Sequence, residues 1–140
     1  MIITDISGDF FRQLNILSLT LAMKIRILGD RVRLRLSQTE VERIGQGGSV
    51  SENTNFPNRI FSYRLVTHSG DPDIRAEYAH DAITISVNGK LATQWAQSDQ
   101  VGLESASGSK LHILIEKDFQ CLTDRSEDES DLFPNPNETC

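Results

Sequence analysis

Hydrophobic and polar residues alternate strictly in two separate stretches of the chain. In the first stretch every intervening residue is an arginine, and in the second the intervening residues are small or polar. A period of two places successive side chains on opposite faces of a strand, so each stretch predicts a β-strand with one buried face. The apolar positions are Val32, Leu34 and Leu36 in the first stretch, and Ile83, Ile85 and Val87 in the second.

Each alternating stretch leads directly into a short amphipathic segment. Ser37 and Glu40 have the spacing of a capping box, in which the hydroxyl accepts the amide of residue 40 and the carboxylate reaches back. Apolar residues including Ile44 then share one helical face. In the second stretch Asn88 is the expected cap, and Trp95 takes the core position that corresponds to Ile44. The pattern therefore predicts two helices of about two turns.

Further short strands complete two units of the same order, β-β-α-β-β. A constant offset of 51 residues aligns the units from Asp30 and Asp81 onward, and it pairs Val50 with Val101. The sequence therefore predicts an internal repeat, a feature that decides the whole architecture. The strands expected outside the alternating stretches span 24–28, 49–52 and 59–67 in the first unit, and 73–78, 101–105 and 110–117 in the second.

The order of strand, two-turn helix and hairpin resembles the swapped-hairpin unit of the AbrB, MazE and MraZ DNA-binding families. The closer likeness lies in ITISVNGKLATQWAQSDQVGLES followed by LHILIEK. Those proteins interlock the hairpins of two units in one small barrel. The resemblance implies a mainly β (α+β) fold, in which two tandem repeats close into one swapped-hairpin-like barrel. A single unit buries too little surface to be stable alone.

These patterns divide the chain into one domain and two flanking pieces. Residues 23–119 are expected to form a single domain of two repeats, 23–69 and 70–119. Residues 120–140 are expected to form an acidic tail that packs on the domain or extends from it.

The chain after residue 22 also resembles a family of small uncharacterised bacterial proteins. The resemblance names no activity. Because that family begins at the residue matched by Met23, we expect Met23 to be the natural start and residues 1–22 to be an extension outside the fold. The matching pieces are MKIRI at 23–27, RLRLSQTEV at 33–41, IEKDFQCL at 115–122 and EDESDLFPNPNETC at 127–140.

Charge is distributed unevenly along a chain whose formal net charge is -6. Residues 23–69 hold 8 Lys/Arg and 4 Asp/Glu, whereas residues 70–119 hold 4 and 8. The tail, residues 120–140, holds 1 and 6. The acidic total argues against non-specific binding of nucleic acid, but the first half of the chain is basic.

Basic side chains on the first two strands are the candidate DNA-binding residues. Cations on an exposed strand face contact phosphates and release counterions. The alternative is a solvated face whose arginines pair with Glu40, Glu42 or the acidic tail, and such exposed pairs contribute about 0–1 kcal/mol each. The tail folding over this face as a competitor for phosphate is a further hypothesis. The candidates are Lys24, Arg26, Arg31, Arg33 and Arg35.

The two cysteines, Cys121 and Cys140, form no recognised metal motif. With His68, His80 or His112 they are candidate zinc ligands, since zinc takes thiolate and imidazole in tetrahedral sites. A disulfide that pins the tail and two unrelated thiols are the other interpretations.

No catalytic motif is present: the sequence has no G-x-S-x-G, no H-E-x-x-H, no phosphate-binding glycine loop and no dinucleotide fingerprint. We therefore expect no enzyme, no catalytic residue and no cofactor. No run approaches the roughly 18 apolar residues of a membrane span. The leading hypothesis is a small cytoplasmic bacterial protein, monomer or homodimer, that binds DNA in the manner of a transcription regulator. The alternative is a protein-interaction or metal-holding module that uses the tail and its cysteines.

Overall fold

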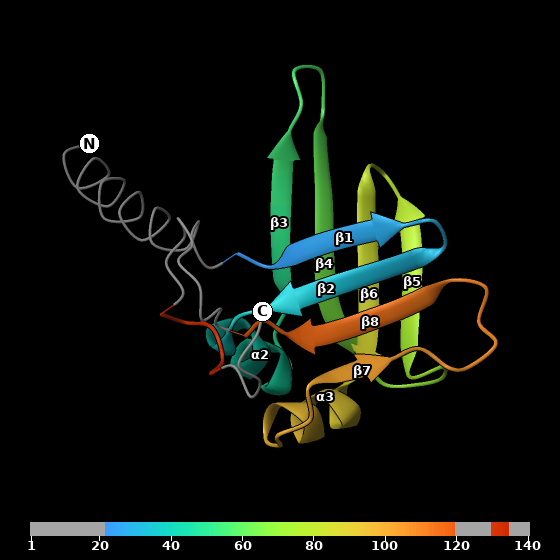
Figure 1. Ribbon diagram of the computed structural model, residues 1–140. Coiled ribbons are helices and arrows are strands. Elements are labelled where there is room, and N and C mark those ends of the chain that lie inside the picture. Colours follow the sequence, from blue (N-terminus) through green and yellow to red (C-terminus); the bar gives the residue numbers. More distant parts are fainter. Residues whose placement is uncertain (1–21, 120–129, 135–140) are drawn as a thin grey trace.

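The protein is mainly β with two short helices. The computed structural model describes residues 22–119 and 130–134, and Figure 1 draws the other residues in grey. The described part holds eight strands and two helices, so the expected β-rich α+β class is confirmed. The elements are β1 (Lys24–Leu28), β2 (Arg31–Leu36), α2 (Gln38–Gly45), β3 (Val50–Asn55), β4 (Ile60–His68), β5 (Ile74–Ala79), β6 (Ala82–Asn88), α3 (Gly89–Ala96), β7 (Gly102–Glu104) and β8 (His112–Lys117).

The strands form two four-stranded sheets, each built from one hairpin of either half of the chain. Sheet A has the order β1-β2-β8-β7, and sheet B has the order β3-β4-β6-β5. In both sheets the two inner strands are parallel and come from opposite halves. Each outer strand pairs antiparallel with its own neighbour in sequence. The first hairpin is therefore joined to the last one, and the two middle hairpins are joined to each other.

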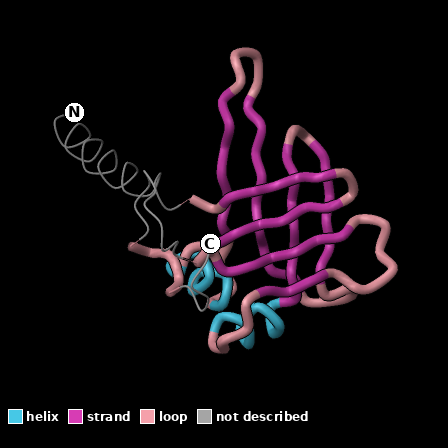
Figure 2. The backbone as a smooth tube through the Cα atoms, viewed as in Figure 1, coloured by secondary structure: helices cyan, strands magenta, loops and turns pink. Residues whose placement is uncertain are grey.

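The strands of the described chain do not close into the expected barrel. Strands β1 and β7 are the edges of sheet A, and β3 and β5 are the edges of sheet B. The strands of sheet A run across those of sheet B (Figure 1), and Figure 2 shows the same two crossed layers in magenta. Two crossed sheets bury their apolar faces against each other without hydrogen bonds between their edges, so closure is not needed to form the core.

The centre of the core lies where the parallel strands face each other between the sheets. Leu34 is paired with Ile115 in sheet A, and Leu65 is paired with Ile85 in sheet B. All four side chains are 0% exposed. Burial of one such side chain contributes about 1.5–3 kcal/mol. Both halves of the chain therefore contribute residues to the centre of the core.

Both helices begin at the predicted caps. The Ser37 hydroxyl accepts the amide of Glu40, and the Glu40 carboxylate accepts the amide of Ser37 at 3.0 Å, which completes the capping box. The Asn88 side chain accepts the amides of Lys90 and Leu91 at 3.0 and 3.3 Å. The two helices lie together at one end of the molecule (Figure 2). Local sequence alone is thus sufficient to start each helix.

Helices α2 and α3 approach each other closely at Gly45. A Cβ atom added to Gly45 would lie 2.5 Å from the Cβ of Ala96. The Thr93 hydroxyl donates a hydrogen bond to the carbonyl of Gly45 at 2.9 Å. Ile44 and Trp95, next to this contact, are 0% and 1% exposed, as expected for core positions. A residue without a side chain is therefore needed where the helices meet.

The offset of 51 residues holds through the helices and then fails. The helices themselves are displaced by 51 residues. Val50 on β3 is buried and pairs with Leu65 of the inner strand β4. In the second half, the buried residue that pairs with the inner strand β8 is Leu103 on β7. Val101 is 45% exposed. Val50 follows Gly45 by five residues, whereas Leu103 follows Ala96 by seven. The expected alignment of Val50 with Val101 is therefore wrong, because the connection after α3 is longer.

The described part of the acidic tail returns to the body of the domain. The amide of Gln38 donates to the carbonyl of Asp131 at 2.9 Å, and the amide of Phe133 donates to the carbonyl of Asp118 at 2.9 Å. Leu132, between them, is 4% exposed. These contacts attach residues 130–134 beside the start of α2.

Replacing Gly45 by alanine tests the helix contact. We expect Gly45→Ala to lower the free energy of unfolding by about 1–3 kcal/mol, because the new methyl group would overlap the methyl group of Ala96. In an unhindered helix the same change would stabilise the protein. Urea unfolding of Gly45→Ala and of the double variant with Ala96→Gly measures the effect.

Two comparisons control this experiment. Gly89→Ala places a methyl group at the start of α3 with no atom nearer than 3.8 Å, so it should be neutral or stabilising. Ala96→Gly should recover part of the loss in the double variant. A Gly45→Ala protein as stable as the parent would contradict the close approach of the helices.

Candidate functional site

All five predicted basic residues lie on one face of the β1–β2 hairpin. The register pairs Lys24 with Arg35 and Arg26 with Arg33. Arg31 lies two residues before Arg33 on β2, so its side chain points to the same side. Val32, Leu34 and Leu36 point to the core, as their burial shows. We call the outer surface formed by Lys24, Arg26, Arg31, Arg33 and Arg35 the basic face.

Strand β8 places an acidic residue within the basic face. In the parallel register His112, Leu114 and Glu116 lie opposite Arg31, Arg33 and Arg35, respectively. Glu116 Oε1 lies 3.1 Å from Arg35 Nε and 3.4 Å from Arg33 Nε. The Glu116 side chain is only 18% exposed, so water competes weakly for these two ion pairs.

A third cation of the basic face is also paired. Lys24 Nζ lies 3.0 Å from Asp118 Oδ2, and the Asp118 side chain is 7% exposed. The expected partners Glu40 and Glu42 are not the acceptors of these ion pairs. The acceptors come from β8 and the residue after it, since the parallel strand brings them beside β1 and β2. Residues 112–118 are the part of the site that sequence reasoning missed.

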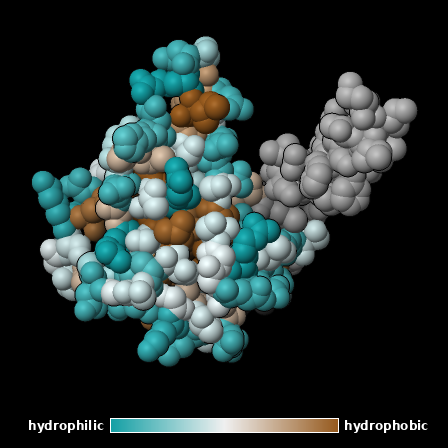
Figure 3. Space-filling model, turned by 180° about the vertical axis from the view of Figure 1, so that it is seen from behind, coloured by the Kyte–Doolittle hydropathy of each residue, from teal (hydrophilic) through white to brown (hydrophobic). Residues whose placement is uncertain are grey.

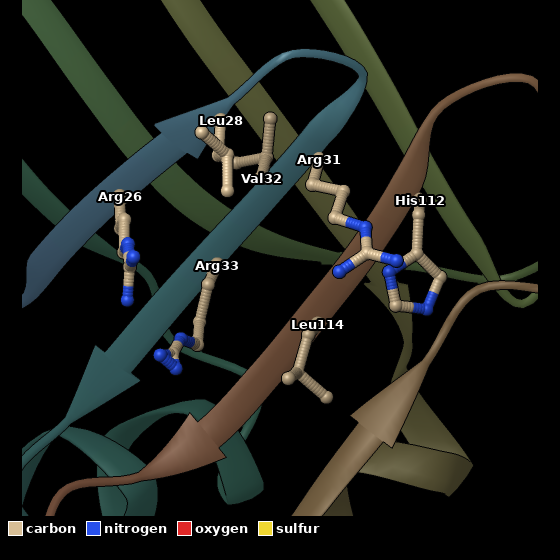
Figure 4. Close-up of a pocket in the computed structure, with 7 residues that line it drawn as sticks. All are labelled: Arg26, Leu28, Arg31, Val32, Arg33, His112 and Leu114. Atoms are coloured by element: carbon tan, nitrogen blue, oxygen red, sulfur yellow. The ribbon is translucent and has the colours of Figure 1, made fainter.

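Two arginines of the basic face have no acidic partner within residues 22–119 and 130–134. These residues, Arg26 and Arg31, border a hollow of about 190 Å³. Figure 4 shows the hollow, with the Arg31 guanidinium next to the imidazole of its register partner His112. Arg33 forms part of the same wall, and Leu28 and Leu114 supply apolar surface. The hollow therefore combines unpaired positive charge with exposed hydrocarbon.

A second hollow of about 220 Å³ lies on the other side of Arg26 and Arg33. Its wall also includes Lys24, Ile25 and Arg35. Three of its four cations are paired with Glu116 or Asp118, whereas two of the three arginines at the first hollow have no acidic partner in the described chain.

The described acidic residue of the tail does not lie on the basic face. Both carboxylate oxygens of Asp131 lie 3.3 Å from the amide of Thr39, in the first turn of α2. A carboxylate at this place stabilises the helix through its unpaired amides and its dipole. The other acidic residues of the predicted competitor fall outside the described residues.

The predicted zinc site has no support within the described chain. Cys121 and Cys140 lie outside the described residues. Within the residues that are described, no three His, Cys, Asp or Glu side chains gather closely enough to hold a metal ion. His68 Nε2 lies 3.2 Å from the carbonyl of Asp73, and His112 Nε2 lies 3.0 Å from Glu104 Oε2. In the same part of the chain, no helix is long and apolar enough to cross a membrane.

Glu40 is a buried acid away from the basic face. Glu40 Oε2 accepts the amide of Met23 at 3.0 Å, and Oε1 accepts the amide and hydroxyl of Ser37 at 3.0 and 3.2 Å. The Tyr63 hydroxyl donates to the carbonyl of Met23 at 2.9 Å. Burial raises the pKa of Glu40 to about 7, although the hydrogen bonds oppose this shift. Met23 is thereby held at both backbone groups.

Lys117 is a buried base beneath the helices. Its Nζ donates to the carbonyl of Ser98 at 2.6 Å and lies 5.8 Å from the ring centroid of Trp95 and 5.4 Å from that of Phe133. Burial lowers the pKa of Lys117, and the nearby Asp99 opposes the shift. The cation is held by a carbonyl and two aromatic faces, which is a structural arrangement.

Comparison with known proteins assigns the chain to a family. Residues 23–137 match the sequence model of a family of unknown function, DUF7009. The chain belongs to the DUF7009 family. The expected resemblance to an uncharacterised family is thus confirmed. Comparisons with curated proteins and with solved structures gave no significant match.

The pKa of Glu40 predicts a pH-dependent stability. The pKa of Glu40 is about 7 in the folded protein and 4.5 in the unfolded chain, so the folded state binds the proton more tightly. This contribution is fully present below pH 4.5 and is lost as pH rises through 7. In the 140-residue chain, the free energy of unfolding should fall from pH 5 to pH 8 relative to that of Glu40→Gln.

Urea unfolding at several pH values measures this difference. Glu42→Gln, an exposed change on the same helix, is the matched control and should follow the parent protein. If parent and Glu40→Gln differ by the same amount at pH 5 and pH 8, the shifted pKa is wrong.

Proposed function

We propose that this protein binds DNA through phosphate contacts on the basic face of sheet A. The observation that carries the proposal is the pair Arg26 and Arg31, which the described chain leaves without acidic partners on an exposed strand surface. Guanidinium groups bind phosphate oxygens through several N–H donors at once. The surface is part of a hydrogen-bonded sheet, so the backbone is already ordered and only the arginine side chains lose conformational freedom on binding.

We further propose that the two halves are related units of the swapped-hairpin type. Two observations support this proposal. The first is the exchange of hairpins through two parallel strand pairs. The second is the common offset of 51 residues in the helices and in the hairpins before them, where Lys24–Arg35 corresponds to Arg75–Ser86. The resemblance to the AbrB, MazE and MraZ families then favours DNA over other polyanions.

The ion pairs limit how strongly the basic face binds DNA. Of its five cations, Lys24 is paired with Asp118, and Arg33 and Arg35 share the single negative charge of Glu116, so three positive charges are left uncompensated. Counterion release scales with the number of phosphates neutralised, with a slope of about −0.9 per contact. Three uncompensated charges predict a slope of about −2.7, which is small for a DNA-binding protein. The affinity for mixed-sequence duplex should therefore be low at physiological salt.

A protein partner is the second candidate function. Phe56 and Ile60, at the end of the β3–β4 hairpin, are 53% and 54% exposed. The hairpin projects beyond sheet A in Figure 1, and apolar atoms lie at this projecting end in Figure 3. Exposed apolar side chains on a projecting hairpin are a feature of interaction surfaces. Cys121 and Cys140, the residues on which the metal-holding alternative depends, lie outside the described residues.

Fluorescence anisotropy with mixed-sequence duplex DNA tests the leading proposal. The parent protein should bind at low salt with a log–log salt slope of about −2.7. Glu116→Gln should release Arg33 and Arg35, which would steepen the slope to about −3.5 and tighten binding at low salt. Replacing Arg31, Arg33 and Arg35 together by serine should abolish binding.

A matched control separates the ion pairs from the net charge. Glu77→Gln makes the same charge change on β5 of sheet B, where the residue is exposed, and should leave the slope unchanged. The proposal is wrong if the parent and Glu116→Gln fail to bind at low salt. Equal slopes for Glu116→Gln and Glu77→Gln would show that Glu116 does not restrain the arginines.

A further inference from the structure

We propose that the hollow between Arg26, Arg31 and His112 is a subsite for one terminal phosphate group, a phosphate monoester. The inference deepens the proposed function, because the same arginines are used. It does not need duplex binding, because a phosphorylated small molecule or a phosphorylated nucleic-acid end presents the same group.

The positions of the three arginines suit one tetrahedral anion. Arg26 lies directly opposite Arg33, and Arg31 is the diagonal neighbour of Arg26. Diagonal positions on one face are about 7–8 Å apart at the backbone, which long side chains can bridge. Arg33 uses its Nε for Glu116, so its terminal nitrogens can still donate into the hollow. Figure 4 shows Arg26 and Arg33 side by side and the Arg31 guanidinium turned toward His112, so Arg31 must change rotamer for one phosphate group to accept from all three guanidinium groups.

Charge favours a monoester over a backbone phosphodiester. Arg26 and Arg31 supply two positive charges without an acidic partner in the described chain. A phosphate monoester carries about −1.5 to −2 at pH 7, whereas each backbone phosphate carries one negative charge. No carboxylate lines the hollow among the described residues; Glu104 Oε2 lies 3.0 Å from Nε2 of the lining residue His112, and Glu116 contacts the lining residue Arg33. A dianion matches the unneutralised charge of the hollow better than a monoanion.

The size and apolar wall of the hollow indicate how much of a ligand it holds. The volume of about 190 Å³ is below the roughly 300 Å³ of the smaller pockets that enclose whole ligands. The hollow therefore takes the phosphate group and the atoms next to it. Leu28 is 61% exposed at its edge, and the organic part of a ligand would cover this side chain.

NMR titration of the full chain with inorganic phosphate tests the subsite. At constant ionic strength, with chloride as the balancing anion, amide signals of the β1–β2 turn and of residues around His112 should shift and saturate. Arg26→Gln and Arg31→Gln should each weaken binding roughly threefold to tenfold. Arg64→Gln, an exposed change on sheet B, is the matched control and should bind as the parent does. Glu104→Gln should bind phosphate more tightly.

Oligonucleotides with 5′-phosphate or 5′-hydroxyl ends and a nucleoside monophosphate identify the source of the group. Saturable phosphate binding without duplex binding would support the subsite and overturn the proposed function. Duplex binding with phosphate shifts no larger than those of chloride would overturn the subsite and leave the proposed function standing. Phosphate binding that is weakened equally in Arg64→Gln and Arg31→Gln would also overturn the subsite.

Discussion

The parallel pairing of β2 with β8 and of β4 with β6 is the interaction on which the rest of the structure depends. Each pair joins strands from opposite halves of the chain and places fully buried residues, such as Leu34 and Ile115, side by side. Without the other half, each inner strand keeps only the outer strand of its own hairpin and loses its parallel partner. Because β2 and β6 each continue directly into a helix, the same pairing also brings α2 and α3 together at Gly45.

The candidate site is a consequence of this pairing. Strand β8 lies beside β2, so its outward side chains alternate in register with the arginines. Glu116 pairs with two arginines that share its one negative charge. His112 and Leu114 complete a hollow beside the two arginines that have no acidic partner in the described chain. Part of the positive charge of β2 is thus compensated by β8 in the folded protein. Its binding properties depend on a strand about eighty residues away.

Local features could be predicted from the sequence, whereas contacts between distant segments could not. The alternation around Leu34 and the caps at Ser37 and Asn88 involve neighbouring residues, so short-range rules suffice. The partner of Arg35 could not be found, because the register between parallel strands depends on the fold. For the same reason, the hydrogen bond between the amide of Met23 and the carboxylate of the capping residue Glu40 could not be predicted from the sequence. The barrel was expected from the resemblance to the swapped-hairpin families, and no feature of the sequence indicated that the strands would form two separate crossed sheets.

Separate production of the two halves, residues 23–69 and 70–140, tests the dependence on exchanged hairpins most directly. Each half alone should give the poorly dispersed NMR spectrum of an unfolded chain, and an equimolar mixture should give the dispersed spectrum of a folded one-to-one complex. Folding of one half as a homodimer would still agree, since copies can exchange hairpins with each other. A half that folds as a monomer would contradict the claim that the two parallel pairs hold the protein together.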